Sequence, residues 1–249
     1  MLSQVKKSLE EIVNAIPEGA ITLDVGASSA PIRRADYIID AVPYTDINWE
    51  QAKGPGEPRF SEERYIQHDI CDREPWPFKD KQFDYSFCSH VLEDIRDPIW
   101  VCSELIRVSK AGYIEIPSRL YETTFGIEAR DLAGASHHRW LVDLADGKLR
   151  FTFKYFYAHA RSVNQNRRNP RKPGEDLVLK LEWKEDFEYG ENWLNSGKEI
   201  FEYYLDRPIS ENEKWMLFRC TSPFSFLSRW FRYLKNTNTF AQNVYNRFR

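Results

Sequence analysis

Three aspartates at the ends of short apolar runs are the first residues whose types and spacing suggest chemistry. Asp24 stands two positions before Gly26 at the end of the first run. Asp40 ends the second run, and Asp69-Ile70 ends the third. A glycine turn lets a ligand approach the backbone, and an acid at the second strand end can accept hydrogen bonds from both ribose hydroxyls. A third carboxylate can accept from an adenine amino group while an apolar neighbour covers the ring. Any one aspartate could instead be a cap or turn residue, but three at successive strand ends indicate a nucleoside-containing ligand.

Three histidines are candidates for proton transfer. His90 follows the fourth apolar run, and His137 and His138 begin the string HHRW, which continues with Arg139. A histidine with a pKa near neutrality can remove the proton of a hydroxyl group. The structural alternatives are that one histidine of the pair packs against Trp140 while the other faces water, and that His90 caps a helix. We predict His138, His137 and His90 as candidate catalytic residues and Arg139 as a substrate-binding residue.

The spacing of apolar residues predicts the elements that must position these groups. A helix is predicted within residues 2–16, and a second one begins at Asp97-Pro98, with aspartate as its cap and proline at its first position. Strands are predicted at 20–25, 37–42, 64–69, 83–88 and 113–116. This order indicates an open, doubly wound α/β sheet, mostly parallel, with ligands at the carboxyl ends of its strands. Beyond Ser118, alternating residues at 149–157 and 177–183 predict two antiparallel strands joined by a long loop.

Two segments are locally basic. The loop 161–173 contains Arg167 and Arg168 among other cations and no acid, and all charged residues of 221–249 are basic. Arginine forks match phosphate and carboxylate groups, so we predict that Arg167 and Arg168 bind an anionic substrate; a solvated loop is the alternative. In the C-terminal segment, apolar residues line one side of a possible helix. We expect that side to pack on the domain, with an anionic membrane surface as the alternative.

Composition limits the classes of function. The 249 residues carry a net charge of −3, which argues against nucleic acid as a partner. The four cysteines have no spacing typical of metal sites, so we expect free thiols in a reducing cytoplasm and no metal centre. No apolar run approaches the roughly 18 to 20 residues of a membrane-spanning helix. We expect one domain over residues 1–249, located in the cytoplasm, with contact at the inner membrane surface through the C-terminal segment as an alternative.

Residues 65–118 resemble the type 11 branch of class I S-adenosylmethionine-dependent methyltransferases. The strings that carry this resemblance are HDICDREPWPFKDKQFDYSFCSHVLEDIRDP (68–98) and ELIRVSKAGYIEIPS (104–118). The resemblance implies a Rossmann-like sheet of seven strands, mostly parallel, with an antiparallel strand near the edge, and S-adenosylmethionine as cofactor. It also implies a role for each candidate cofactor residue. Asp24 and Gly26, with Ala27 beside them, would hold the methionine end, Asp40 the ribose, and Asp69 and Ile70 the adenine, while Ser89 or His90 would line the reaction centre.

The sequence departs from the family pattern at two places. The first loop keeps only Gly26 where the family has two or three glycines, and the short interval to Asp40 predicts a turn in place of a helix. The second histidine of the family's HVLEH turn is Asp94 here, which we interpret as a cap of the next helix.

Similar HHRW strings occur in relatives linked to glycan and natural-product assembly, so the resemblance favours O-methylation of a sugar, a glycan precursor or another small molecule. We predict a core over 20–118, an accessory region over 119–220 and a basic, aromatic tail over 221–249. The alternatives are a non-catalytic binding or scaffolding protein, which the thinned glycine loop favours, and a nicotinamide-dependent enzyme. The latter needs a G-x-G-x-x-G turn that Gly26-Ala27-Ser28 does not supply.

Overall fold

The computed structural model describes residues 1–27, 30–124, 126–129, 132–155, 158, 177–195, 199–200 and 202–203. The chain divides into two compact units, Met1–Trp193 and Leu194–Arg249. Each unit is taken by itself, and the description below concerns the first. The expectation of one domain over residues 1–249 stays a prediction.

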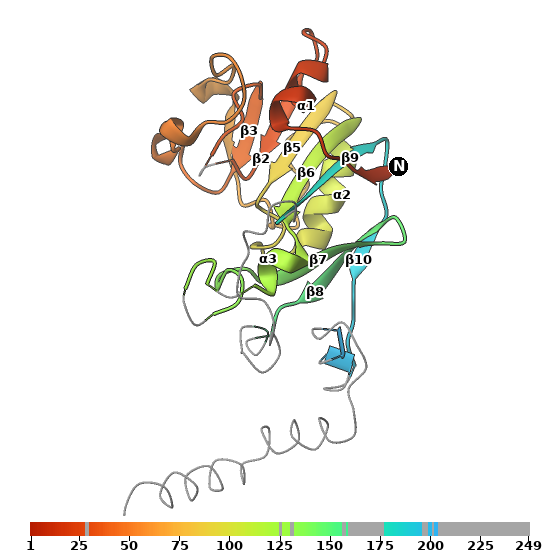
Figure 1. The fold of residues 1–249 in the computed structure, drawn as a ribbon. Helices are drawn as coiled ribbons and strands as arrows, with labels where there is room; N and C mark the ends of the chain where they lie inside the picture. The colour runs from red at the N-terminus through yellow and green to blue at the C-terminus, as the bar shows by residue number, and fades with distance from the viewer. Residues whose placement is uncertain are drawn as a thin grey trace, which may run out of the picture. The chain divides into compact units, whose positions relative to one another are not determined.

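Seven strands of the first unit form one sheet in the order β1-β9-β6-β5-β2-β3-β4 (Figure 1). The parallel strands are β2 (Thr22–Val25), β3 (Tyr37–Asp40), β4 (Tyr65–Gln67), β5 (Tyr85–Ser89) and β6 (Ala111–Pro117). Strand β9 (Val178–Lys184) runs antiparallel to β6, and β1 (Leu2–Gln4) runs antiparallel to β9 at the edge. The predicted sheet, mostly parallel with an antiparallel strand next to the edge, is confirmed.

The strand register brings several carboxyl ends to the same edge of this sheet. Val25 at the end of β2 pairs with Ile39 of β3 and with Cys88 of β5. The chain goes from β2 outward to β3 and β4, and then crosses back to β5 on the other side of β2. The crevice beside the strand ends at such a reversal of direction is where open α/β sheets bind their ligands.

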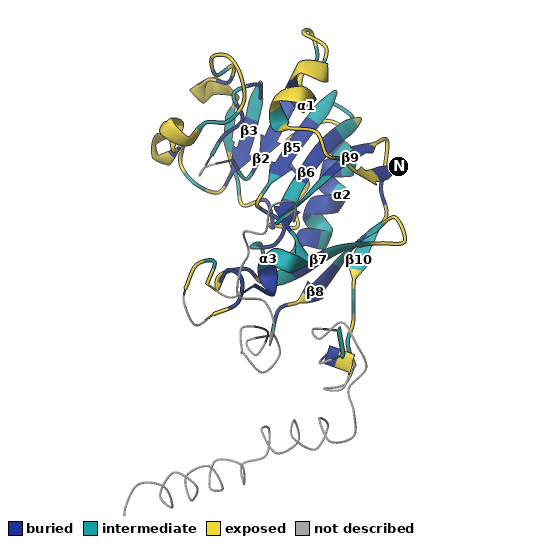
Figure 2. Ribbon diagram, in the orientation of Figure 1, coloured by how far each residue is buried: buried dark blue, intermediate teal, exposed yellow. Residues whose placement is uncertain are grey.

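Helix α2 (Pro98–Val108) covers the sheet and begins as predicted. The Asp97 side chain accepts a hydrogen bond from the Trp100 backbone N–H at 3.0 Å, and Pro98 occupies the first helical position. The buried side of α2 packs into the main apolar core together with the strands (Figure 2). The other short elements are α3 (Arg119–Glu122) and three 3-10 helices, η1 (Tyr44–Asp46), η2 (Trp49–Gln51) and η3 (Glu62–Arg64). No helix occurs among the described residues between β2 and β3, as the short interval predicted.

The first 16 residues differ from the prediction of one continuous helix. Residues Leu2–Gln4 form strand β1, and the helix α1 is limited to Leu9–Ala15. Ser8 ends the extended stretch because its side chain accepts from the Glu11 backbone N–H while the Glu11 carboxylate accepts from the Ser8 backbone N–H. The helical spacing of apolar residues therefore corresponds to a helix only after this capping box.

The predicted pairing of residues 149–157 with 177–183 is wrong. Strand β8 (Lys148–Phe153) belongs to a separate sheet of three strands, in the order β10-β8-β7, with β7 (Trp140–Ala145) antiparallel and β10 (Tyr189–Glu191) parallel to it. Strand β9 pairs instead with β6 and β1. Alternation shows only that one face of a strand is buried, and it does not select the partner.

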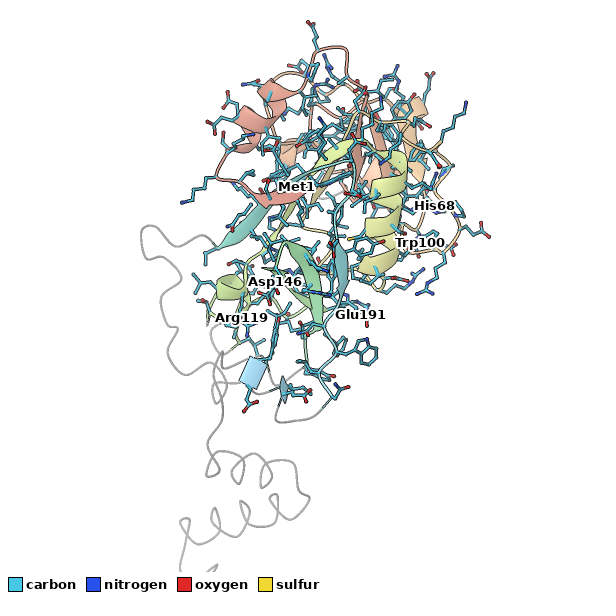
Figure 3. All side chains as sticks on the ribbon, turned by 90° about the vertical axis from the view of Figure 1, so that its right-hand side faces the viewer. Met1, His68, Trp100, Arg119, Asp146 and Glu191 are labelled. Atoms are coloured by element: carbon cyan, nitrogen blue, oxygen red, sulfur yellow. The ribbon has the colours of Figure 1, made fainter. Side chains whose placement is uncertain are left out.

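Strand β7 was not predicted, although its turn carried a signal. Asp146 and Gly147 join β7 to β8 with φ of +52° and +74°, and Figure 3 labels Asp146 at this turn. Two residues with positive φ are what a tight type I′ hairpin requires, and Asp-Gly is among its preferred sequences. No helix in the part of the chain that the structure describes is long and apolar enough to cross a membrane.

Candidate cofactor and acceptor site

A cavity of about 400 Å³ lies at the carboxyl ends of the parallel strands. Its volume is in the range of sites for small molecules and cofactors. Six residues singled out from the sequence line it. They come from the end of β3, from the loops after β2, β4 and β5, and from the position just before β7: Gly26, Asp40, Asp69, Ile70, His90 and Arg139. Two further lining residues, Asp94 and Arg96, were not predicted to take part in a site.

Gly26 lies in the first loop, directly after β2, where two features disfavour a residue with a side chain. Its φ is +69°, and its N–H donates to the carbonyl of Ile39 at 2.9 Å. A Cβ at this position would lie 2.6 Å from Cγ2 of Val91 in the loop after β5. The backbone of the first loop therefore approaches the neighbouring loop as closely as a glycine allows.

Asp24 and Ala27 lie on either side of Gly26 in the chain, but they are not among the described residues that line the cavity. Asp24 is only 2% exposed, and its carboxyl group accepts a hydrogen bond from the Ile32 backbone N–H at 2.8 Å. Burial, with Asp40 nearby, raises the pKa of Asp24 to about 7. Ala27 is buried against the side of β3. The structure thus places both residues behind the first loop, where Asp24 holds its shape. Their contact with the methionine end of the cofactor stays a prediction.

Asp40 ends β3 on the cavity wall. Its side chain is 6% exposed, and its Oδ1 accepts from the Val42 backbone N–H at 3.0 Å, which fixes the carboxylate at the strand end. This is the position at which an acid can accept hydrogen bonds from ribose hydroxyls.

Asp69 and the buried Ile70 line the cavity from the loop after β4, where Arg96 joins them. Oδ1 of Asp69 accepts from the Cys71 backbone N–H at 2.9 Å, and Oδ2 pairs with Nη1 of Arg96 at 2.6 Å. Partial burial pulls the pKa of Asp69 upward, but the hydrogen bonds from Arg96 and Cys71 hold it below its ordinary value. Nothing in the local sequence distinguishes Arg96 from an exposed cation.

His90 lies on the cavity as a cation. Its Nδ1 is 3.3 Å from Glu93 and its Nε2 is 3.3 Å from Glu115, and these two carboxylates raise its pKa to about 9. His90 is therefore protonated near neutral pH, which argues against the predicted role as a base. Its φ of +57° is uncommon for a side chain other than glycine, and such strain concentrates at functional sites. Ser89, at the end of β5, has its hydroxyl 3.4 Å from Glu115.

His137 and His138 lie next to the cavity through Asp94. Their Nε2 atoms are 3.9 Å and 3.8 Å from the two carboxylate oxygens of Asp94, which lines the cavity. Asp94 does not cap helix α2, because Asp97 does. The contact of Asp94 with two histidines more than 40 residues later in the chain was not predicted.

The two histidines differ in exposure. His138 is buried and stacks on Tyr121, and its Nδ1 is 2.5 Å from Glu122, which also accepts from the buried ammonium of Lys154. Burial alone lowers the pKa of His138, but the charge and hydrogen bond of Glu122 raise it overall. The His137 side chain is 60% exposed, with Nδ1 3.2 Å from Glu128. Neither arrangement is the structural alternative in which one histidine packs on Trp140; the indole N–H of Trp140 donates to the carbonyl of Ile95 at 2.9 Å.

Of the three arginines predicted to bind substrate, the structure describes only Arg139. Arg139 lines the cavity, and its backbone N–H donates to the carbonyl of Glu93 at 2.7 Å. Arg167 and Arg168, with the loop 161–173, and the tail 221–249 lie outside the described residues.

Comparisons with known proteins bear on the core of the chain. Residues 23–114 match the model of the type 11 methyltransferase domain. A comparison with curated proteins finds no match.

Three solved structures show a partial likeness. YcgJ of Bacillus subtilis is 20% identical (43% of this chain, 49% of that one), a methyltransferase of Aquifex aeolicus 17% (44% and 64%), and one of Mesorhizobium loti 15% (58% and 63%). The TM-score is 0.32 for each, so the likeness bears on neither activity nor substrate. The chain spans between 49% and 64% of the length of these structures.

The family match covers the parallel strands and most of the residues that line the cavity. It begins in β2, ends in β6, and so contains Asp24, Gly26, Asp40, Asp69 and His90. The residues present also fit an adenosyl cofactor, since a buried carboxylate, an apolar side chain and a close backbone approach meet at one cavity. The sequence of residues 23–114 is therefore similar to the type 11 methyltransferase domain, and this match supports S-adenosylmethionine as the cofactor.

Proposed function

We propose that this protein transfers a methyl group from S-adenosylmethionine to a hydroxyl oxygen of a small molecule, such as a sugar, a glycan precursor or a natural product. One observation carries the proposal: Asp94, which lines the cavity at the strand ends, lies within 3.9 Å of the imidazoles of both His137 and His138. Groups suited to a nucleoside and groups suited to proton transfer therefore meet at neighbouring positions.

At the cofactor end, Asp40 would accept from the ribose hydroxyls, and Asp69 with Ile70 would hold the adenine. When bound, S-adenosylmethionine supplies a methyl group on a positively charged sulfur. His90, held as a cation between Glu93 and Glu115, fixes the loop that faces this end of the cavity. Gly26 keeps the first loop low enough for a ligand to lie over it.

At the acceptor end, His137 is the better placed of the two histidines to act as a base. Its side chain is exposed, and Glu128 at 3.2 Å from Nδ1 orients the ring so that Nε2 lies 3.9 Å from Asp94, which lines the cavity. The acceptor proton would pass to Nε2 as the oxygen–carbon bond forms and the carbon–sulfur bond breaks. Arg139, with Arg167 and Arg168 of the basic loop, would bind an acceptor that carries a phosphate or a carboxylate.

The proposal is tested first by calorimetry of the full chain with S-adenosylmethionine and with its demethylated product. Binding of either supports a methyltransferase. The absence of heat with both ligands, from folded protein, would instead favour a non-catalytic binding or scaffolding protein, for which the single glycine of the first loop is the specific observation.

The acceptor end is tested once a substrate is in hand. His137→Ala should lower turnover by roughly a hundredfold or more while cofactor affinity stays the same. Reversing the charges of Arg167 and Arg168 together should raise KM without lowering kcat, and added salt should act in the same direction. Unchanged turnover in the His137 variant would remove that residue from the reaction.

A further inference from the structure

We infer that Asp94, His137 and His138 form a binding site for a divalent first-row transition-metal ion. One ligand atom from each residue lies within 4.8 Å of the other two, the residues come from the loop after β5 and the segment before β7, and no ion is required by the proposed function itself. Local sequence patterns do not predict this site, because Asp94 is far from the histidine pair along the chain.

The ligand atoms lie close enough together to bind one metal ion after a local movement of the side chains. The two Nε2 atoms lie 3.9 Å and 3.8 Å from separate oxygens of the Asp94 carboxylate. With metal–ligand bonds of about 2.0 to 2.2 Å in tetrahedral geometry, neighbouring ligand atoms are roughly 3.3 to 3.6 Å apart. These two pairs need to close by a few tenths of an ångström, and the widest pair of the three ligand atoms, within 4.8 Å, by up to roughly 1.5 Å.

Both rings are oriented in the way that metal-binding histidines are. Nδ1 of His138 is 2.5 Å from Glu122, and Nδ1 of His137 is 3.2 Å from Glu128. An Nδ1–H group that donates to a carboxylate leaves the lone pair on Nε2, and outer carboxylates of this kind commonly fix the tautomer of a metal ligand. The outer carboxylates are themselves held, since Glu122 accepts from the ammonium of Lys154 and Glu128 accepts from the Ser136 backbone N–H at 2.9 Å.

The same orientation leaves the Asp94 carboxylate and the two Nε2 atoms facing one another. With both Nδ1 atoms turned to carboxylates, two Nε2 lone pairs face the negative charge of Asp94. Oδ1 of Asp94 is buried and accepts no hydrogen bond from any described residue. A cation bound between these three groups would give a partner to the buried oxygen of Asp94 and to both Nε2 atoms.

The donor set selects the class of cation. Two imidazoles and one carboxylate suit zinc, iron, cobalt or nickel, whereas magnesium and calcium prefer oxygen ligands alone. Three protein ligands also leave a position open for a substrate atom, as catalytic sites do.

The role of the ion rests on the proposed function. Because Asp94 lines the cavity, an acceptor hydroxyl that entered there could coordinate at the open position. Coordination lowers the pKa of the hydroxyl, so that its proton leaves to water at the mouth of the cavity. With the ion bound, His137 and His138 act as ligands, and His137 no longer needs to accept the proton itself.

Metal binding is tested on the full chain after treatment with a chelator, by titration with Co²⁺ alone and measurement of its visible absorption. We expect one ion per chain, displacement by Zn²⁺ and no displacement by Mg²⁺. Asp94→Asn and His137→Ala should each weaken Co²⁺ binding at least tenfold, and Glu128→Gln, which acts through His137, about 10- to 100-fold. His68→Ala removes a histidine outside the cluster (labelled in Figure 3) and should change nothing.

Thermal melting of each variant shows whether it is folded, and calorimetry with S-adenosylmethionine is run on the same chelated protein. Failure of the folded wild type to bind Co²⁺, or equal binding by wild type and the Asp94 and His137 variants, overturns the metal site and leaves protonated rings as the balancing charge. Cofactor binding without Co²⁺ binding overturns the metal site alone. Co²⁺ binding without cofactor binding supports the site and overturns the proposed function.

Discussion

Replacing Gly26 by alanine should show how much of the cofactor loop depends on one missing side chain. The added Cβ meets two separate obstacles. The residue has φ of +69°, and the new atom would lie 2.6 Å from Cγ2 and 2.9 Å from Cγ1 of Val91. Real Cβ atoms do not approach other carbons so closely, so either Val91 or the loop has to move.

The two obstacles can be assigned separate magnitudes. A residue other than glycine in the left-handed region costs about 1 to 2 kcal/mol. Forcing extra volume into a packed contact costs typically 1 to 3 kcal/mol. Gly26→Ala should therefore lower the free energy of unfolding by about 2 to 5 kcal/mol, which is the sum of the two ranges.

Two other glycines provide matched controls for the same substitution. A Cβ at Gly147 meets nothing within 4 Å, but φ there is +74°, so Gly147→Ala measures the backbone cost alone. A Cβ at Gly19 also meets nothing, and its φ is outside the left-handed region, so Gly19→Ala should change stability by less than about 0.5 kcal/mol.

The assay is urea unfolding of the single variants together with Val91→Ala and the Gly26→Ala/Val91→Ala pair. Removal of the Val91 methyl groups should recover the steric part of the loss, so the pair should be less destabilised than the sum of its members by about 0.5 to 3 kcal/mol. If Gly26→Ala costs no more than Gly147→Ala, or if the pair is simply additive, the close approach of the two loops has no energetic weight and the reasoning is refuted.

Two further predictions concern the carboxylates beside this loop. Asp40→Asn keeps an acceptor for the Val42 N–H but loses the charge, so calorimetry should show S-adenosylmethionine binding weakened by about 1.5 to 3 kcal/mol, while the exposed Asp46→Asn has no effect. Asp24, with a pKa raised to about 7 in the folded protein, binds its proton more tightly there than in the unfolded chain, so its contribution to stability falls as the pH rises from about 4 to 7. Asp24→Asn should therefore gain about 2.5 kcal/mol relative to wild type between pH 5 and pH 8 in urea unfolding, and an equal difference at both pH values would contradict a neutral Asp24.

The position of the cavity could be predicted from the sequence because parallel strands place their carboxyl ends at one edge of a sheet. Asp40 and Asp69 follow this rule directly, and both line the cavity. Asp24 matched the same pattern, but its carboxyl group is turned to the Ile32 backbone N–H behind the loop. A strand-end acid can satisfy either a ligand or the protein's own backbone, and the pattern alone does not distinguish these two cases.

The second sheet and the edge of the first could not be predicted from periodicity. Strands β8 and β9 have the same alternation, yet one pairs with β7 and the other with β6 and β1. Strand β1 has only three residues, too few to show a period, and is held by its pairing with β9. Long-range pairing of this kind depends on which partner has a free edge after the central strands have formed, and that information is spread over the whole chain.

The loop after β5 accounts for one departure of this chain from the family pattern, the aspartate at position 94. His90 contacts the cofactor cavity at one end of the loop, and Asp94 reaches the histidine pair at its other end, while the carbonyl of Glu93 accepts from the N–H groups of both Arg139 and Trp140. These backbone bonds bring the segment after His138 against the loop. The family pattern has a histidine where Asp94 stands, and an imidazole there would add a third ring beside two Nε2 atoms without supplying a charge. A carboxylate instead provides the negative partner that either two protonated rings or a bound cation requires, so Asp94 and the histidine pair are electrostatically complementary parts of one site.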